Sequence, residues 1–142
     1  MADLLDRLIG RWELNGQVGT LPLRQEVSAG WSLGGRYVEA RFRSLAGQAP
    51  YEAVIYLAAL PAEEGYVMHQ LDSRDVALEG AVARGRRVKD SLRFTLPGAE
   101  GQAHYTWHYA AGEDTWRLEH SREQDGQATL LSTAEMKRLA WL

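Results

Sequence analysis

The stretch from Glu26 to Arg43, EVSAGWSLGGRYVEARFR, constrains the fold most, because it predicts two strands joined by a tight turn at Gly34-Gly35. Such turns need positive φ angles, which glycine adopts without strain. Folding the chain there pairs Trp31 with Val38, Ala29 with Ala40 and Val27 with Phe42 on an apolar face. A slip of one residue would bury the charges of the opposite face, so the register is well specified. The apolar face, Trp31 included, is predicted to belong to the core.

Alternating apolar and polar residues, interrupted by turn residues about every ten positions, continue through most of the chain. Short connections make neighbouring strands antiparallel, and no long helical crossover is available for a parallel sheet. Closing such a meander removes its two exposed edges. The sequence therefore predicts an all-β protein, an antiparallel meander of about eight to ten strands closed into a barrel. One short helix is predicted over Asp3 to Ile9, with Asp3 as its N-cap.

Several boundaries follow from turn residues. Gly65 to Asp72 and Asp75 to Ala83 are predicted to form a hairpin. Arg84-Gly85 is predicted as the next tight turn, followed by one strand from Arg86 to Leu96. The basic run at 84–89 is interpreted as a solvated turn, with a phosphate or nucleic-acid role as the less favoured alternative.

The segment from Tyr51 to Leu60 is apolar on both faces, which leaves its inner side unassigned. Its β-branched and aromatic residues favour a strand over a helix. A strand of this kind could also pair two copies of the chain into a homodimer.

Composition limits the class of protein. The 142 residues are predicted to form a single domain over 1–142, and 45% apolar with 25% charged residues is typical of a soluble protein. A net charge of −3 without a basic face argues against a nucleic-acid partner. The absence of cysteine excludes disulfides and thiolate chemistry and fits a reducing compartment. The charged N-terminus, MADLLDRLIG, is neither a signal peptide nor a membrane span, so a cytoplasmic protein is expected.

A short helix leading into Gly10-Arg11-Trp12 resembles the G-x-W opening of the calycins, the group of lipocalins and fatty-acid-binding proteins. The segment WSLGGRY at 31–37 and the ending from Asp125-Gly126 to Arg138 are similar to a bacterial calycin-like family of unknown function. The resemblance implies that Trp12 plugs one end of the barrel beneath a basic residue of the last strand. Arg138, or alternatively Lys137, stands at that position.

The resemblance also implies a barrel that can hold an apolar ligand, and it implies no reaction. Two departures from the group matter. Only Gly19-Thr20 separates the first two strands, where fatty-acid-binding proteins place a helical lid. The sequence W-E-L-N-G after Gly10-Arg11 differs from the opening of nitrobindin-type haem barrels, so haem is disfavoured and no cofactor is predicted.

The segment from Gln102 to Glu123 is predicted as a hairpin that pairs Tyr109 with Trp116 and Tyr105 with His120 on an aromatic face, with a polar face opposite. The aromatic face should point inward, where its side chains either line a cavity or fill the core. The predicted lining residues are Tyr105, Trp107, Tyr109, Trp116, Leu118 and His120, together with Phe94 and Leu131.

Other titratable residues have alternative interpretations. His120 could donate a proton to a ligand, bind haem or be a hydrogen-bonded core histidine, which is the favoured reading. Asp90, Glu135 and His69 could anchor the polar end of a ligand, or the two carboxylates could lie at the rim. His104 and His108 would be roughly 13 Å apart on one strand face, too far to share a metal ion, and no metal site is predicted.

Three functions remain open, and no known catalytic motif is present to decide among them. The first is a binder of a small apolar or amphipathic ligand. The second is an enzyme that uses His120, Asp90 or Glu135 as a proton carrier, which is the less favoured alternative. The third is a solid barrel that acts through protein association.

Overall fold

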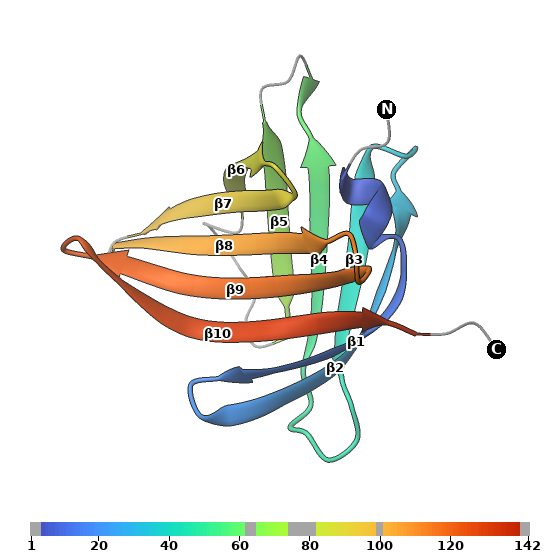
Figure 1. The fold of residues 1–142 in the computed structure, drawn as a ribbon, viewed down its shortest axis with the longest axis horizontal. Coiled ribbons are helices and arrows are strands. Elements are labelled where there is room, and N and C mark those ends of the chain that lie inside the picture. The colour runs from blue at the N-terminus through green and yellow to red at the C-terminus, as the bar shows by residue number, and fades with distance from the viewer. Residues whose placement is uncertain (1–3, 62–64, 74–81, 99–100, 140–142) are drawn as a thin grey trace.

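The protein forms a closed barrel of antiparallel strands (Figure 1), seen in a computed structural model that describes residues 4–61, 65–73, 82–98 and 101–139. Within these residues each of ten strands pairs with its sequence neighbours, and β1 pairs with β10 to close the barrel. The strands are β1 (Gly10–Val18), β2 (Leu21–Ser32), β3 (Tyr37–Ser44), β4 (Glu52–Ala59), β5 (Tyr66–Asp72), β6 (Val82–Val88), β7 (Ser91–Gly98), β8 (Gly101–Ala110), β9 (Thr115–Gln124) and β10 (Gln127–Arg138). The predicted all-β antiparallel barrel is confirmed.

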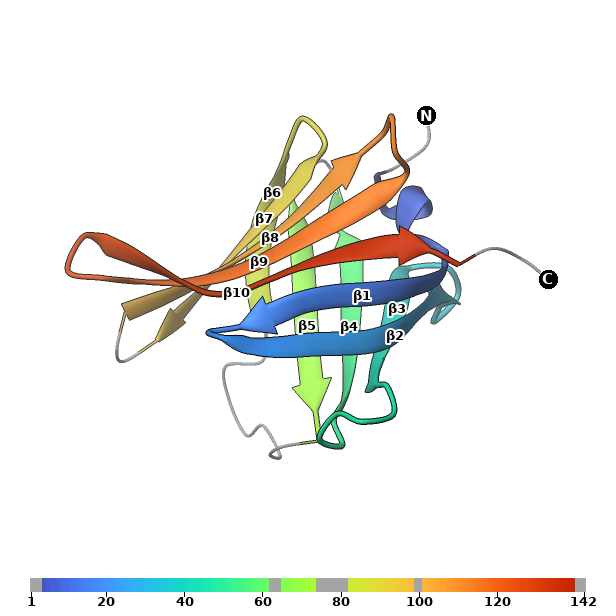
Figure 2. The ribbon, with the colours of Figure 1, turned by 60° about the horizontal axis from the view of Figure 1, so that its bottom comes forward.

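The two ends of the barrel differ. One end, which we call the plugged end, is where β1 begins and β10 ends, and the short helix η1 (Leu4–Leu8) lies there (Figure 2). The opposite end, which we call the far end, carries the turns at Gly19-Thr20 and Asp125-Gly126. Strands β7 to β10 cross in front of β3 to β5 in Figure 1, so the core lies between these two parts of the sheet.

The N-terminal element is a five-residue 3₁₀ helix rather than the predicted longer helix. Its side chains Leu4, Leu5 and Leu8 are at most 4% exposed. Such a short helix is stable only when it packs on a larger element, which here is the plugged end. The predicted N-cap, Asp3, lies outside the described residues. Across those residues, no helix has the length and apolar character needed to cross a membrane.

The β2–β3 hairpin has the predicted register, with Trp31 opposite Val38 and Val27 opposite Phe42. Gly34 and Gly35 have φ angles of 71° and 79°, as the tight turn requires. The prediction that Trp31 lies in the core is wrong, because this side chain is 43% exposed. The first residue of β1, Gly10, pairs with Ala29, so Trp31 extends past the barrel and has no β1 neighbour to cover it.

The predicted turn at Arg84-Gly85 is also wrong. Both residues lie within β6, and the turn falls at Lys89-Asp90, so the predicted strand from Arg86 to Leu96 is divided between β6 and β7. Gly85 serves a different purpose, because a Cβ atom there would lie 2.5 Å from Phe94 Cδ1 and would also overlap the Arg93 carbonyl oxygen. Most of the predicted strand from Asp75 to Ala83 lies outside the described residues.

Substituting Gly85 with alanine is therefore expected to lower the free energy of unfolding by about 1–3 kcal/mol, the usual cost of overpacking. The matched control is Gly30→Ala in β2. A Cβ at Gly30 meets nothing within 4 Å, so this change is expected to be neutral or slightly stabilising. Urea unfolding of both variants checks the comparison, and equal losses of stability would contradict it.

Candidate functional site

The plugged end is closed by Trp12, which is 0% exposed. Its indole Nε1–H donates a hydrogen bond of 2.8 Å to the carbonyl oxygen of Leu8 in η1. The guanidinium carbon of Arg138 lies 4.1 Å from the centre of the Trp12 ring, a distance at which the cation is attracted to the ring face. Lys137, the alternative candidate for this position, instead lies 3.7 Å from Glu135 on the outside of β10.

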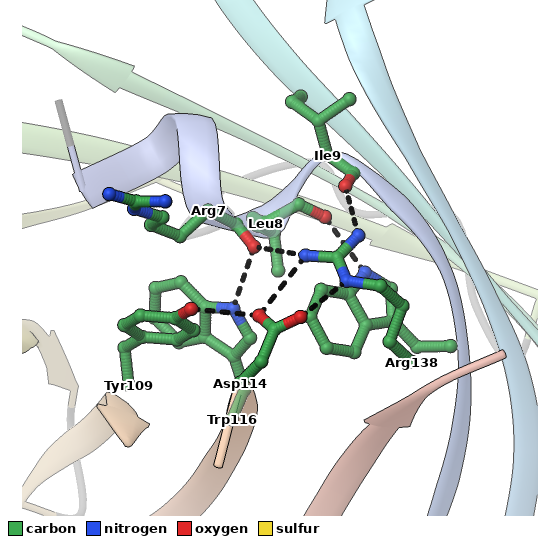
Figure 3. Close-up of polar contacts among 8 residues, drawn as sticks. Arg7, Leu8, Ile9, Tyr109, Asp114, Trp116 and Arg138 are labelled. Carbon is green, nitrogen blue, oxygen red and sulfur yellow. Dashed lines mark hydrogen bonds and ion pairs between the residues drawn. The ribbon is translucent and has the colours of Figure 1, made fainter. Parts of the chain in front are cut away.

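Arg138 also ties η1 to the barrel through hydrogen bonds (Figure 3). It donates to the carbonyl oxygens of Ile9 at 2.7 Å and Arg7 at 3.1 Å. Its Nε donates to Asp114 Oδ2 at 2.8 Å, and the other oxygen of Asp114 accepts from the Tyr109 hydroxyl at 2.7 Å. The carbonyls at the end of a short helix lack helical partners, so these bonds satisfy groups that would otherwise be unpaired. The cluster therefore holds η1 and the turn before β9 against the end of β10.

Hydrogen bonding from Arg138, reinforced by Tyr109, lowers the pKa of Asp114 below its ordinary value of 3.8. A carboxylate of this kind stabilises the fold above its unfolded pKa, and the contribution is lost as the pH falls through the lower folded value. We therefore expect Asp114→Asn to lower the melting temperature at pH 7, with the deficit relative to wild type shrinking below pH 3.8. Glu113→Gln, an exposed carboxylate in the same loop, is the control. A deficit that is constant with pH would contradict the role of the ion pair.

The predicted aromatic face is assembled by β8 and β9 with the expected register, Tyr109 opposite Trp116 and Tyr105 opposite His120. Trp107 and Trp116 are 2% and 1% exposed and meet edge to face, with ring centres 6.4 Å apart. Tyr109 and Phe94 are also buried in the core. These four predicted lining residues therefore fill the interior and do not face a cavity.

Tyr105, Leu118 and His120 differ, because they face the interior yet are only partly buried. An inward side chain in a closed barrel keeps accessible surface where the interior is not filled or where the barrel opens to solvent. The rings of Tyr105 and His120 stack with their centres 4.4 Å apart and their planes within 10°. The inward face at this level is therefore an aromatic wall that remains partly accessible to solvent.

The charges of Arg122 and Asp72 act on the pKa values of the two stacked rings. Burial, and then the charge of Arg122, lowers the pKa of His120 below its ordinary value of 6.5, so the imidazole is mainly neutral at pH 7. Burial raises the pKa of Tyr105; the charge of Arg122 opposes this rise, and the charge of Asp72 adds to it. Asp72 Oδ2 also accepts a hydrogen bond of 3.4 Å from the Tyr51 hydroxyl. The stack therefore presents an uncharged histidine and tyrosine on which the charge of Arg122 acts.

Gln25 adds a polar group on the inner face of β2. Its side chain is 4% exposed and alternates with the fully buried Val27. Among the described residues no hydrogen bond reaches its carboxamide, while every fully enclosed side-chain nitrogen or oxygen there has a partner. The carboxamide of Gln25 must therefore border space that water can reach.

The structure places the three predicted polar anchors outside the interior. Asp90 lies in the β6–β7 turn at the plugged end, 3.8 Å from Arg87. His69 is on the outer face of β5, where its ring centre is 6.1 Å from that of Tyr37. Glu135 lies on the outer face of β10 beside Lys137.

A β-bulge accounts for the position of Glu135. The β9–β10 register shifts between Leu130 and Ser132, which brings Ala134 and Met136 inward and turns Glu135 outward. Leu131 is the unpaired bulge residue, half-buried, and its carbonyl oxygen accepts a 3.1 Å hydrogen bond from Gly19.

His120, Asp90 and Glu135 thus do not converge on one pocket, which counts against an enzyme built on these proton carriers.

The sequence analysis did not identify Arg122 and Asp72 as residues on the inward faces of their strands. Asp72 was predicted only as the last residue of a strand, but it continues the inward face of Met68 and Gln70 to the end of β5. Arg122 pairs with Ala103 and continues the inward face of His120. Both residues would have been found if the inward alternation of each strand had been continued by two more residues.

The fold and site define a class of protein, an antiparallel meander barrel that is plugged at one end by a 3₁₀ helix and has partly accessible inward side chains toward the other. Among the described residues, no group of three or more His, Cys, Asp or Glu could hold a metal ion. Comparison with known proteins found neither a family model nor a curated sequence that matches the chain.

Proposed function

We propose that this protein binds a small amphipathic molecule inside the barrel, in the part that Tyr105 and His120 line. The observation that carries the proposal is the stack of these two rings, which faces inward and yet remains partly accessible. Burial of aromatic surface is strongly stabilising, so a ligand that covers the accessible part of these rings gains binding energy.

The chemistry of the wall indicates the kind of ligand. The stacked rings offer a flat apolar surface, and neutral His120 and Tyr105 can exchange hydrogen bonds with a polar substituent. Arg122 supplies a permanent cation one pleat further toward the far end. These groups suit a molecule with an apolar, preferably ring-bearing body and a polar or anionic end.

The resemblance to the calycins supports the same function. Its G-x-W motif is Gly10-Arg11-Trp12, and Arg138 lies over Trp12 as the resemblance implied. In that group such a plug leaves the opposite part of the barrel available for a ligand. The proposal needs no cofactor and no catalytic step.

A filling substitution tests the proposal. Ala103 faces inward between Leu96 and Arg122, so Ala103→Trp should occupy the proposed space. We expect wild-type protein to take up an apolar fluorescent dye, and Ala103→Trp to weaken uptake by about tenfold or more, equivalent to about 1.4 kcal/mol. Gln102→Trp adds the same ring one residue away on the exposed outer face and is the matched control.

Native mass spectrometry of the purified protein complements the dye assay by showing any molecule that co-purifies. The proposal fails if the wild type neither takes up dye nor carries a bound species. It also fails if Ala103→Trp and Gln102→Trp bind the dye equally well.

A further inference from the structure

A groove of about 700 Å³ crosses the outer face of β6, β7, β8 and β9, on the other side of the sheet from the barrel interior. Its polar lining consists of three arginines, one carboxylate and three other polar side chains: Arg84, Arg86, Arg93, Glu119, Thr95, His104 and Thr106. The arginines face outward because the residues that alternate with them, such as Ala83 and Phe94, are 1% exposed and belong to the core.

The three arginines form a cluster of like charge. Arg86 lies directly opposite Arg93 across the β6–β7 pair, and Arg84 lies opposite Thr95. Arg84 and Arg86 are two residues apart on one strand face, roughly 7 Å. Like charges at directly opposite positions destabilise a sheet. The chain has more acidic residues, 19, than basic residues, 16, so the cluster does not follow from a general excess of cations.

Nearby carboxylates do not neutralise the cluster. Within the described ranges, none of the three arginines forms an ion pair or a side-chain hydrogen bond. Glu119 is on β9, separated from Arg93 by Thr106 of β8. Glu123 lies 2.9 Å from His104 Nε2, and Nδ1 of the same ring lies 3.1 Å from the Thr95 hydroxyl. The groove therefore presents three unpaired guanidinium groups beside threonine hydroxyls.

We propose that this groove binds a small phosphorylated compound through a terminal phosphate or diphosphate. Guanidinium groups match phosphate oxygens in paired hydrogen bonds and stay charged at any physiological pH. An anion that lies between two or three of these guanidinium groups is attracted to each of them, and this attraction offsets the repulsion between Arg86 and Arg93. The volume of the groove falls within the range of small-molecule sites.

A single-stranded nucleic acid fits the groove less well. Tracking a phosphodiester backbone requires a longer positive path with stacking aromatic side chains. Here the positive region covers β6 and β7 and is bordered on β9 by Glu119 and Glu123. The groove lies outside the barrel, so this inference does not depend on the proposed interior ligand.

Titration with inorganic pyrophosphate at low salt tests the inference, with calorimetry for affinity and thermal unfolding for stability. We expect wild-type protein to bind pyrophosphate and to melt at a higher temperature in its presence. Arg93→Gln should bind about tenfold more weakly. Arg117→Gln, which removes an exposed arginine that is on the same outer face of β9 but does not line the groove, should bind as the wild type does.

The melting temperature of the Arg93→Gln variant without pyrophosphate shows whether weaker binding reflects a loss of folding. Because the substitution removes a like-charge contact, the free variant should melt at the same or a higher temperature than wild type, so weaker binding cannot be due to unfolding. Equal affinity of wild type and Arg93→Gln overturns the inference. So does an absence of binding to wild type at millimolar pyrophosphate, or tighter binding of a single-stranded oligonucleotide that lacks a terminal phosphate.

Discussion

Replacement of Trp12 with alanine is expected to lower the free energy of unfolding by about 3–5 kcal/mol, the usual cost of truncating a buried large aromatic residue. The side chain is completely buried, so its removal leaves a cavity at the plugged end. The hydrogen bond to Leu8 and the contact with the Arg138 guanidinium are lost as well. Chemical denaturation followed by circular dichroism measures the change.

Trp31→Ala is the control, because it makes the same substitution at a side chain that is 43% exposed. A loss of about 1 kcal/mol or less is expected there. If Trp12→Ala does not fold, Trp12→Phe retains most of the apolar area and removes only the N–H donor, with an expected cost of about 1–2 kcal/mol. Similar losses for the Trp12 and Trp31 variants would show that the plug does not hold the barrel end closed.

Replacement of Arg138 with glutamine is expected to cost about 2–4 kcal/mol. One guanidinium holds the carbonyl oxygens of Arg7 and Ile9 and both oxygens of Asp114. Glutamine cannot span these partners, so carbonyls at the end of η1 lose their donors. Arg117→Gln, an exposed arginine in the neighbouring strand β9, should change stability by no more than about 0.5 kcal/mol.

A double-mutant cycle isolates the ion pair. Arg138→Gln and Asp114→Asn remove opposite partners of one contact, so their combined effect should be smaller than the sum by more than about 0.5 kcal/mol. Additive losses would mean that Arg138 stabilises the fold through the backbone of η1 and the Trp12 ring alone.

Local alternation was a reliable guide wherever the strands were regular. The β2–β3 pairing from Glu26 opposite Arg43 to Trp31 opposite Val38 was predicted residue by residue. The same was true of β8 and β9, where Tyr105 lies opposite His120. In both hairpins a one-residue slip would put charges into the core, so the pattern allows one register.

Glycine was a less reliable guide, because it has two uses that look alike in a sequence. Gly34 and Gly35 supply positive φ in a turn. Gly85 instead makes room for the Phe94 ring, and the turn nearby uses Lys89, whose φ is 54°. Only the packing of β6 against β7 separates the two uses.

The predicted polar anchors failed for reasons that involve more than one strand. The bulge at Leu130–Ser132 reverses the face of Glu135, and the β6–β7 turn removes Asp90 from its supposed strand. His120 was placed correctly on the inward face, because its strand has no interruption between Thr115 and Gln124. Its favoured interpretation as a hydrogen-bonded core histidine was wrong, because within the described residues the ring is only partly buried and stacks on Tyr105 without a hydrogen bond.

From its sequence alone this protein is determined to be a closed antiparallel barrel, with inward positions defined wherever a strand runs without a bulge or turn, because side-chain direction in a strand alternates locally. Tertiary structure decided which inward side chains are sealed, as Trp116 is, and which stay accessible, as His120 does. It also decided which charges meet: Arg138 with Asp114 at the plug, and Arg86 with Arg93 on the outer face. These outcomes depend on how distant strands are staggered around the barrel, and no local pattern of residues specifies that stagger.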